Sequence, residues 1–264
     1  MTRIPRILLV FHTLFAIFML APLVMVVLVA FTDKGYIALP FDGASWRWFR
    51  AILDNGDFIT AFQRSLVLAA GAATLAVLLA IPAGMAIAWY RFTGREAILG
   101  LLLSPLMVPP IVLGIAMLRF LTQIGGSGTM AGLVAAHTVI VMPYVLRLVV
   151  AAATGFDRSI AHAAESLGAS PLTVFWRIEL PSILPGVAGG WLIAFITSFD
   201  ELSLTIFVAS PSTQTLPVKM YAYIANTIDP LLASISAVLL ALTLILMVLL
   251  ERFFGLERVL GGKT

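Results

Sequence analysis

Residues 157–181 read DRSIAHAAESLGASPLTVFWRIELP, a stretch that is polar on one side, apolar on the other and too interrupted by charge to cross a bilayer. Asp157 can cap a first helix, because its carboxylate accepts hydrogen bonds from first-turn amides. Gly168 can end that helix, since glycine adopts the left-handed conformation that other residues resist. Ser170 and Pro171 then supply an N-cap and a residue suited to the first helical position. The stretch therefore predicts a helix, a sharp turn and a second short helix.

The second helix, expected from Pro171 to about Glu179, presents an apolar face between charged residues. The apolar side chains are Leu172, Val174, Phe175, Trp176 and Ile178. Leu180 and Pro181 are expected to end the helix, since helix is disfavoured immediately before proline. An apolar face presented between membrane spans is expected to dock in a groove of a partner protein.

The run HAAESLGAS and the later IELP resemble the EAA loop of the membrane subunits of binding-protein-dependent ABC importers. In that family the loop holds a coupling helix that docks on the ATPase subunit. The motif positions E-A-A-x-x-x-G and I-x-L-P are matched by Ala163, Ala164, Gly168, Ile178, Leu180 and Pro181. His162 stands where the family usually has glutamate, and Glu165 lies three residues further on. The alternative is an amphipathic surface helix between two spans.

The resemblance implies that the segment 157–181 contacts an ATPase. The residues to which it assigns this coupling role are His162, Ala163, Ala164, Glu165, Gly168, Ala169, Ser170, Pro171, Leu172, Phe175, Trp176, Ile178, Leu180 and Pro181.

The composition is that of an integral membrane protein. Of 264 residues, 61% are hydrophobic and only 11% are charged, and the mean hydropathy is +1.07, which leaves too little polar surface for a soluble domain. The net charge of +3 comes from few ionisable groups and does not indicate nucleic-acid binding. With no cysteine, the chain has no disulfide and no Cys-ligated metal. The apolar run 7–31 is too long for the core of a signal peptide and predicts an uncleaved first span.

Six stretches are long and apolar enough to cross a hydrocarbon layer that needs ~20 helical residues. They lie near 8–31, 65–90, 98–120, 130–151, 184–208 and 231–250. Continuous apolarity without strand-like alternation favours helices over a barrel. We therefore expect an all-α, polytopic helical bundle in which residues 1–264 form a single transmembrane permease domain of the type I ABC importer class, as the resemblance implies.

The distribution of Lys and Arg favours both termini in the cytoplasm. With the N-terminus inside, the ten inner basic residues are Arg3, Arg6, Arg91, Arg95, Arg147, Arg158, Arg177, Arg252, Arg258 and Lys263. The six outer ones are Lys34, Arg47, Arg50, Arg64, Arg119 and Lys219. The segment 157–181 is then cytoplasmic, where an ATPase could reach it.

Three local clusters carry further expectations. In the outer loop 32–63, Trp46, Arg47 and neighbouring aromatic and basic residues predict an interface anchor, with contact to an extracytoplasmic partner as the alternative. Pro109 and Pro110 predict a bent helix inside the bundle, a candidate moving part of a gate. A lone intramembrane histidine, His137, is expected to be a packed hydrogen-bonding residue and not a metal ligand.

The fifth span carries two adjacent acidic residues, Asp200 and Glu201. A helix that starts near Leu184 reaches Asp200 after ~24 Å of a ~30 Å core. A carboxylate at that depth costs at least ~2–3 kcal/mol, so it should face water, a partner charge or a passing cation. Adjacent side chains point about 100° apart, so at most one faces the path squarely. The alternative is that they cap or pair at a break in this helix.

The run SFDELSLTIFVASPSTQTLPVKMY resembles the fifth-span signature of permeases from polyamine (spermidine/putrescine) importers. It is carried by Ser198, Asp200, Glu201, Phe207, Pro211, Thr215, Leu216, Pro217, Val218, Lys219 and Met220. The resemblance implies a small, cationic solute such as a polyamine, and close relatives import other small amines and amino-acid derivatives. The expected substrate path or gate consists of Asp200, Glu201, Phe199, Tyr144, Pro109 and Pro110.

No sequence of the form GxxxxGK[ST] occurs, so ATP and Mg are expected on a separate subunit. The family implies two copies of an ABC ATPase, a second homologous permease in a heterodimeric pair, and a periplasmic or extracellular solute-binding protein, in the lipid of a bacterial inner membrane. An ion-coupled secondary transporter is the second class considered. A membrane enzyme has little support, because the histidines His12, His137 and His162 are scattered without a nucleophile or metal cluster.

Overall fold

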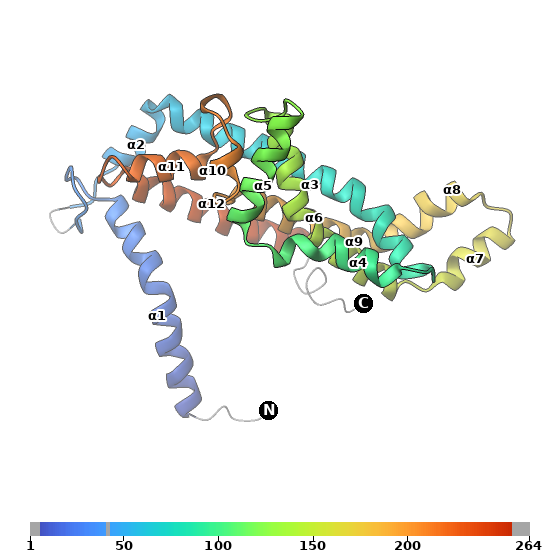
Figure 1. Ribbon diagram of the computed structural model, residues 1–264. Coiled ribbons are helices and arrows are strands. Elements are labelled where there is room, and N and C mark those ends of the chain that lie inside the picture. Colours follow the sequence, from blue (N-terminus) through green and yellow to red (C-terminus); the bar gives the residue numbers. More distant parts are fainter. Residues whose placement is uncertain (1–5, 41–42, 255–264) are drawn as a thin grey trace. The chain divides into compact units, whose positions relative to one another are not determined.

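The computed structural model describes residues 6–40 and 43–254, and these residues form helices and loops without any strand. Arg3, Arg258 and Lys263 of the charge analysis lie outside the described residues. The helices, coloured along the chain in Figure 1, are α1 (Arg6–Ala30), α2 (Arg47–Asp54), α3 (Gly56–Trp89), α4 (Arg95–Leu103), α5 (Pro110–Gln123), α6 (Met130–Gly155), α7 (Arg158–Ser166), α8 (Pro171–Val174), α9 (Leu180–Phe199), α10 (Thr205–Val208), α11 (Leu216–Ile224) and α12 (Leu231–Phe254).

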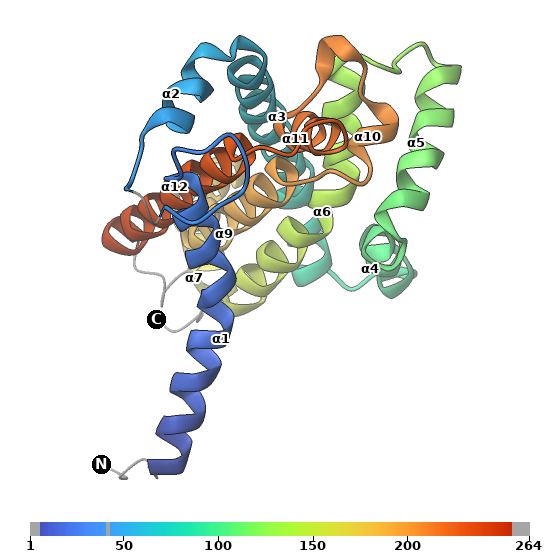
Figure 2. The same ribbon diagram turned by 90° about the vertical axis from the view of Figure 1, so that its left-hand side faces the viewer.

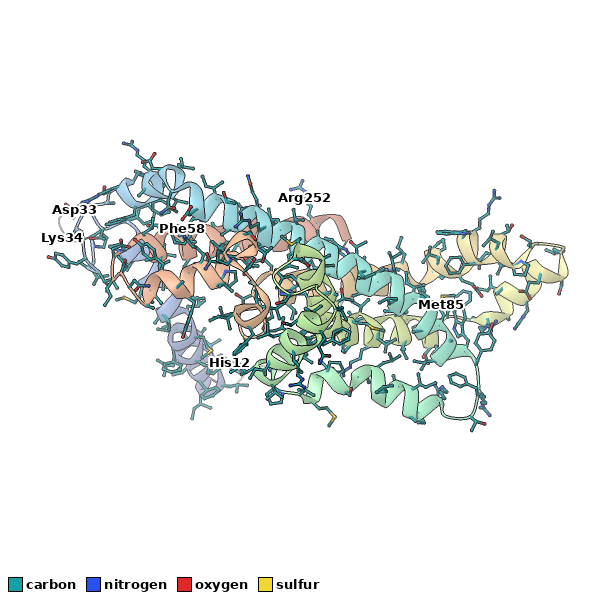
Figure 3. All side chains as sticks on the ribbon, turned by 45° about the horizontal axis from the view of Figure 1, so that its top comes forward. His12, Asp33, Lys34, Phe58, Met85 and Arg252 are labelled. Atoms are coloured by element: carbon teal, nitrogen blue, oxygen red, sulfur yellow. The ribbon has the colours of Figure 1, made fainter. Side chains whose placement is uncertain are left out.

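The chain divides into two units, which we describe separately. Of the described residues, the first comprises 6–40, 43–60 and 220–249. In it, the Ser234 hydroxyl donates to the Ala30 carbonyl over 3.2 Å. The ring of Phe58, labelled in Figure 3, meets Tyr223 edge-on at 5.4 Å. The predicted aromatic cluster in the outer loop forms, because the Phe31 ring lies 5.1 Å from Trp46 and 4.9 Å from Phe49. Its role as a membrane anchor stays a prediction.

The second unit, which comprises the described residues 61–219 and 250–254, has its core where α3, α6 and α9 pack together. Small residues of α3 are fully buried there, including Ala72, Ala76 and Ala80. Helices α6 and α9 run side by side (Figure 2) and approach closely at Gly186. A Cβ at Gly186 would lie 2.6 Å from the Ala152 Cβ, so glycine is required for this approach.

Four helices are long and apolar enough to span a membrane, and a bent pair of helices raises the number to five among the described residues. Helix α12 lies where the sixth span is predicted, but its described apolar part, Leu231–Ile245, is shorter than the other spans. The prediction of an all-helical polytopic protein is confirmed. The count of six spans is not confirmed.

The predicted bend in the third span is a complete break. After the 3₁₀ turn Ser104–Met107, Val108 is extended, and the two helical parts meet at 105°. Pro109 restricts Val108 to extended conformations, and neither Pro109 nor Pro110 can donate a backbone hydrogen bond. Within this chain the bend is not buried, because α4 and the 3₁₀ turn bury no residue and Met107 is 87% exposed, and its position inside a bundle stays a prediction.

Candidate functional site

The segment 157–181 begins with a capped helix and a tight turn, as predicted. Asp157 accepts a hydrogen bond from the Ser159 amide at 2.9 Å. This bond lowers the pKa of Asp157 below its usual range. The cap is therefore present above the ordinary pKa of aspartate and is lost as pH falls through the lower folded-state pKa. Figure 1 shows α7 and α8 projecting from the end of the second unit at which α3 ends.

The turn after α7 depends on Gly168, which has φ +90°. The Gly168 amide donates to the Glu165 carbonyl at 2.9 Å, and the Ala169 amide donates to Ala164 at 3.0 Å. This pair of bonds is the Schellman pattern that closes a helix on a left-handed residue. Ser170 then accepts from the Thr173 amide at 3.3 Å and starts α8 at Pro171. The predicted glycine stop and serine cap are both confirmed.

Replacing Gly168 with alanine is expected to cost about 1–2 kcal/mol, because a Cβ disfavours the left-handed conformation. The cost is purely conformational, since a Cβ at this position would meet no atom within 4 Å. Hydrogen exchange of the Ala169 amide should become faster. The matched control is Gly155→Ala, whose Cβ also meets nothing and whose φ is not positive. Equal acceleration in both variants would contradict this explanation.

The second helix does not end at Pro181, and that prediction is wrong. Helix α8 continues through the π-helical turn Phe175–Glu179 into α9. The Leu180 amide donates to the Phe175 carbonyl, five residues back. Proline cannot make the usual bond, and a local π turn accommodates it within a continuing helix. One continuous helix of 29 residues, Pro171–Phe199, therefore joins the segment to the predicted fifth span.

The coupling residues divide between an exposed and an inward side. Those that are exposed are His162, Ala163, Glu165, Gly168, Ser170, Pro171, Leu172, Trp176 and Pro181. Those that are half-buried are Ala164, Ala169, Phe175, Ile178 and Leu180. Phe175 and Leu180 pack against the core of the second unit. The side chains of Leu172 and Trp176 are 69% and 60% exposed, so they form the apolar face available to a partner.

The two acidic residues lie at a break in the predicted fifth span. Helix α9 ends at Phe199, Asp200 is its C-cap, and α10 begins at Thr205. A single uninterrupted helix over 184–208 is therefore wrong. The Glu201 carboxylate accepts from the Leu204 amide at 2.8 Å and the Thr205 amide at 2.9 Å. Because these bonds satisfy the start of α10, the alternative of a cap at a helix break is confirmed for Glu201.

Asp200 differs from its neighbour. Its side chain is exposed, and no hydrogen bond or ion pair to its carboxylate occurs among the described residues. The preceding ring, Phe199, lies 5.9 Å from Phe62 of α3 and 6.2 Å from Phe195. Asp200 thus follows directly after a residue whose ring packs against two other aromatic rings. Tyr144 is half-buried and Pro109 and Pro110 are exposed, and no described contact joins them to Asp200.

His137 connects this break to α6 through a buried hydrogen-bonded network. Its Nδ1 lies 2.8 Å from the Ser198 hydroxyl, and its Nε2 lies 2.9 Å from the Thr205 hydroxyl. The Thr205 hydroxyl donates to Glu201, at 2.7 Å to the carboxylate, so it must accept from Nε2–H. The predicted structural role of His137 is confirmed. Its partner Thr205 was missed, because nothing in the sequence indicates which hydroxyl meets the imidazole.

Replacing His137 with leucine is expected to lower Tm in detergent by about 5–10 °C. The change removes the imidazole partner of two buried hydroxyls, those of Ser198 and Thr205, at a cost of about 2–4 kcal/mol. The matched control is Thr138→Val in the same helix, because the Thr138 hydroxyl donates to Val134 one turn back at 2.7 Å. That variant should lose about 1 kcal/mol or less. Similar losses of stability in the two variants would show that the His137 network stabilises the fold no more than a single hydrogen bond does.

No group of three or more His, Asp or Glu side chains that could hold a metal ion is found in the described part of the chain. The described residues offer two surfaces for recognition: an exposed apolar face at one end of a long helix and the exposed carboxylate of Asp200 at the other.

Comparison with known proteins places this arrangement among transport proteins. Residues 76–256 match the family described as "Binding-protein-dependent transport system inner membrane component". The chain is 32% identical over 228 residues to the spermidine/putrescine permease protein PotC of Haemophilus influenzae, covering 86% of this chain and 88% of that one. It is 30% identical to the putrescine permease protein PotI of Escherichia coli K12, covering 84% and 82%.

A solved structure shares the fold. A bacterial ABC transporter that imports the acidic polysaccharide alginate has a chain that superposes with a TM-score of 0.74 at 15% identity. The match covers 96% of this chain and 99% of that chain. The predicted fold class is thereby confirmed.

Proposed function

The chain belongs to the family of binding-protein-dependent transport system inner membrane components, and from this premise we propose that it is a permease subunit of an ATP-driven importer whose solute is a small, cationic polyamine. The names of its relatives PotC and PotI support this solute class. The unpaired, exposed carboxylate of Asp200 is a suitable contact for a protonated amine.

A single observation carries the proposed mechanism: the helix Pro171–Phe199 has the apolar docking face at its start and Asp200 directly after its end. At 1.5 Å per residue it is about 40 Å long. A displacement of Leu172 and Trp176 by an ATPase would be transmitted along this helix to Asp200, the proposed contact for the solute. Nucleotide binding can then favour one global arrangement of the path over another.

The proposal includes the remaining partners. Two ATPase subunits, which hold ATP and Mg, dock on the segment 157–181 from the cytoplasm. A second homologous permease completes the path as a heterodimer, and a periplasmic or extracellular solute-binding protein delivers the amine. The protein is a multi-pass membrane protein, which we place in a bacterial inner membrane with both termini cytoplasmic, as the bias of Lys and Arg favours.

The test is co-purification of the chain with its ATPase and partner permease, followed by reconstitution in liposomes. Spermidine and putrescine, delivered by the binding protein, should stimulate ATP hydrolysis and enter the liposomes only when the ATPase is present. Amino-acid derivatives serve as competing solutes. Entry of solute without any ATPase subunit would instead support an ion-coupled secondary transporter.

A further inference from the structure

The end of α3 meets the start of α7 through an aromatic and cationic contact. The Arg158 guanidinium carbon lies 5.0 Å from the ring centre of Trp89 and 5.5 Å from that of Tyr90. Trp89 is the last residue of α3 and Arg158 is the first residue of α7. We propose that these three residues form a clamp, through which movement of the coupling segment reaches α3.

The aromatic side of the clamp is anchored to a third helix. The Trp89 indole N–H donates to the Ala153 carbonyl at 2.8 Å, in the last turn of α6. The Trp89 ring also lies 5.9 Å from the ring of Phe156, which follows α6. Ala153 is fully buried. The ring that receives Arg158 is therefore held in place by both hydrogen bonding and packing.

Among the described residues Arg158 makes no ion pair within salt-bridge distance, although its charge acts on the carboxylate of Glu179. The Nε atom of Arg158 is buried and makes no hydrogen bond among the described residues. The ring faces of Trp89 and Tyr90 contact the guanidinium by cation–π attraction, and the charge of Glu179 adds a longer-range attraction. Arg158 is also fixed to a rigid element, because Asp157 caps α7 directly before it. A displaced α7 would consequently carry the clamp with it.

Helix α3 connects the clamp to the residue that precedes Asp200. Helix α3 runs from Trp89 back to Phe62, whose ring lies 5.9 Å from Phe199. Phe199 is the last residue of α9 and directly precedes Asp200. Two routes thus lead from the coupling segment to the same place: the continuous helix Pro171–Phe199, and the clamp followed by α3. The clamp therefore makes α3 and the helix Pro171–Phe199, which meet at Phe62 and Phe199, move together.

This inference rests on the proposed function, and its test uses the complete transporter in liposomes with the binding protein and spermidine. Arg158→Met should lower the number of solute molecules transported per ATP hydrolysed by at least about fivefold, while the ATPase still co-purifies. Arg158→Lys keeps the cation and should recover part of this ratio. A double-mutant cycle with Trp89→Leu should show that the two changes together are no worse than either alone.

A second readout does not depend on activity. The chain has no native cysteine, so spin labels can be placed at Phe92→Cys and Ser159→Cys, which flank the clamp and are exposed. The distance distribution between them should be narrow during turnover and broaden with Arg158→Met. An unchanged transport ratio and distribution, or loss of ATPase binding, would overturn the clamp. Failure of the unsubstituted chain to bind any ATPase would refute the proposed function itself.

Discussion

Replacing Leu172 with aspartate is expected to reduce ATP-driven transport by at least about 30-fold, the effect of losing a central interface contact. Leu172 and Trp176 lie one turn apart and are exposed apolar side chains at the start of the helix Pro171–Phe199. A carboxylate placed there would be desolvated in a partner groove without a counter-charge. Pull-down of the ATPase by the membrane-inserted variant should weaken in parallel with transport.

Two controls accompany this change. Leu172→Met keeps the apolar surface and should retain transport. Phe175→Asp alters a neighbouring aromatic residue that packs against the core instead, so it should lower Tm rather than act on docking alone. Full transport by the Leu172→Asp variant would mean that the ATPase contacts another part of the chain.

The second large effect on transport is expected from a substitution of Asp200. Replacing it with asparagine keeps the shape but removes the charge, and should lower transport of spermidine by about 10- to 100-fold, the value of a hydrogen bond to a charged group. The carboxylate is exposed and has no partner in the described residues, so folding should not depend on it. ATPase co-purification and Tm should remain unchanged while uptake of labelled spermidine falls.

The neighbouring Glu201 provides the matched control for Asp200. Glu201→Gln replaces a carboxylate that accepts from two backbone amides, and should cost about 1–2 kcal/mol of stability through a weakened cap. Its effect on transport should be smaller than that of Asp200→Asn. The reverse order, with transport abolished by Glu201→Gln alone, would show that the solute contacts Glu201.

Features that arise within a few residues could be predicted from the sequence. Asp157 and Ser170 bond to amides two and three residues away, and Gly168 ends α7 by its own backbone conformation. The break at Pro109 follows from the restrictions that proline places on itself and on Val108. The prediction that the chain spans a membrane followed in the same way from the length of its apolar stretches.

The sequence by itself determined the membrane-spanning class, the capped turn after α7 and the start of a helix at Pro171, because each depends on local composition or hydrogen bonding. Only the tertiary structure decided that the helix continues through Pro181, since Phe175 and Leu180 gain packing against the core that a local preference does not include. It also separated Asp200 from Glu201. It likewise brought His137 to the hydroxyls of Ser198 and Thr205, 61 and 68 residues away, and contacts at such separations are set by how the helices pack.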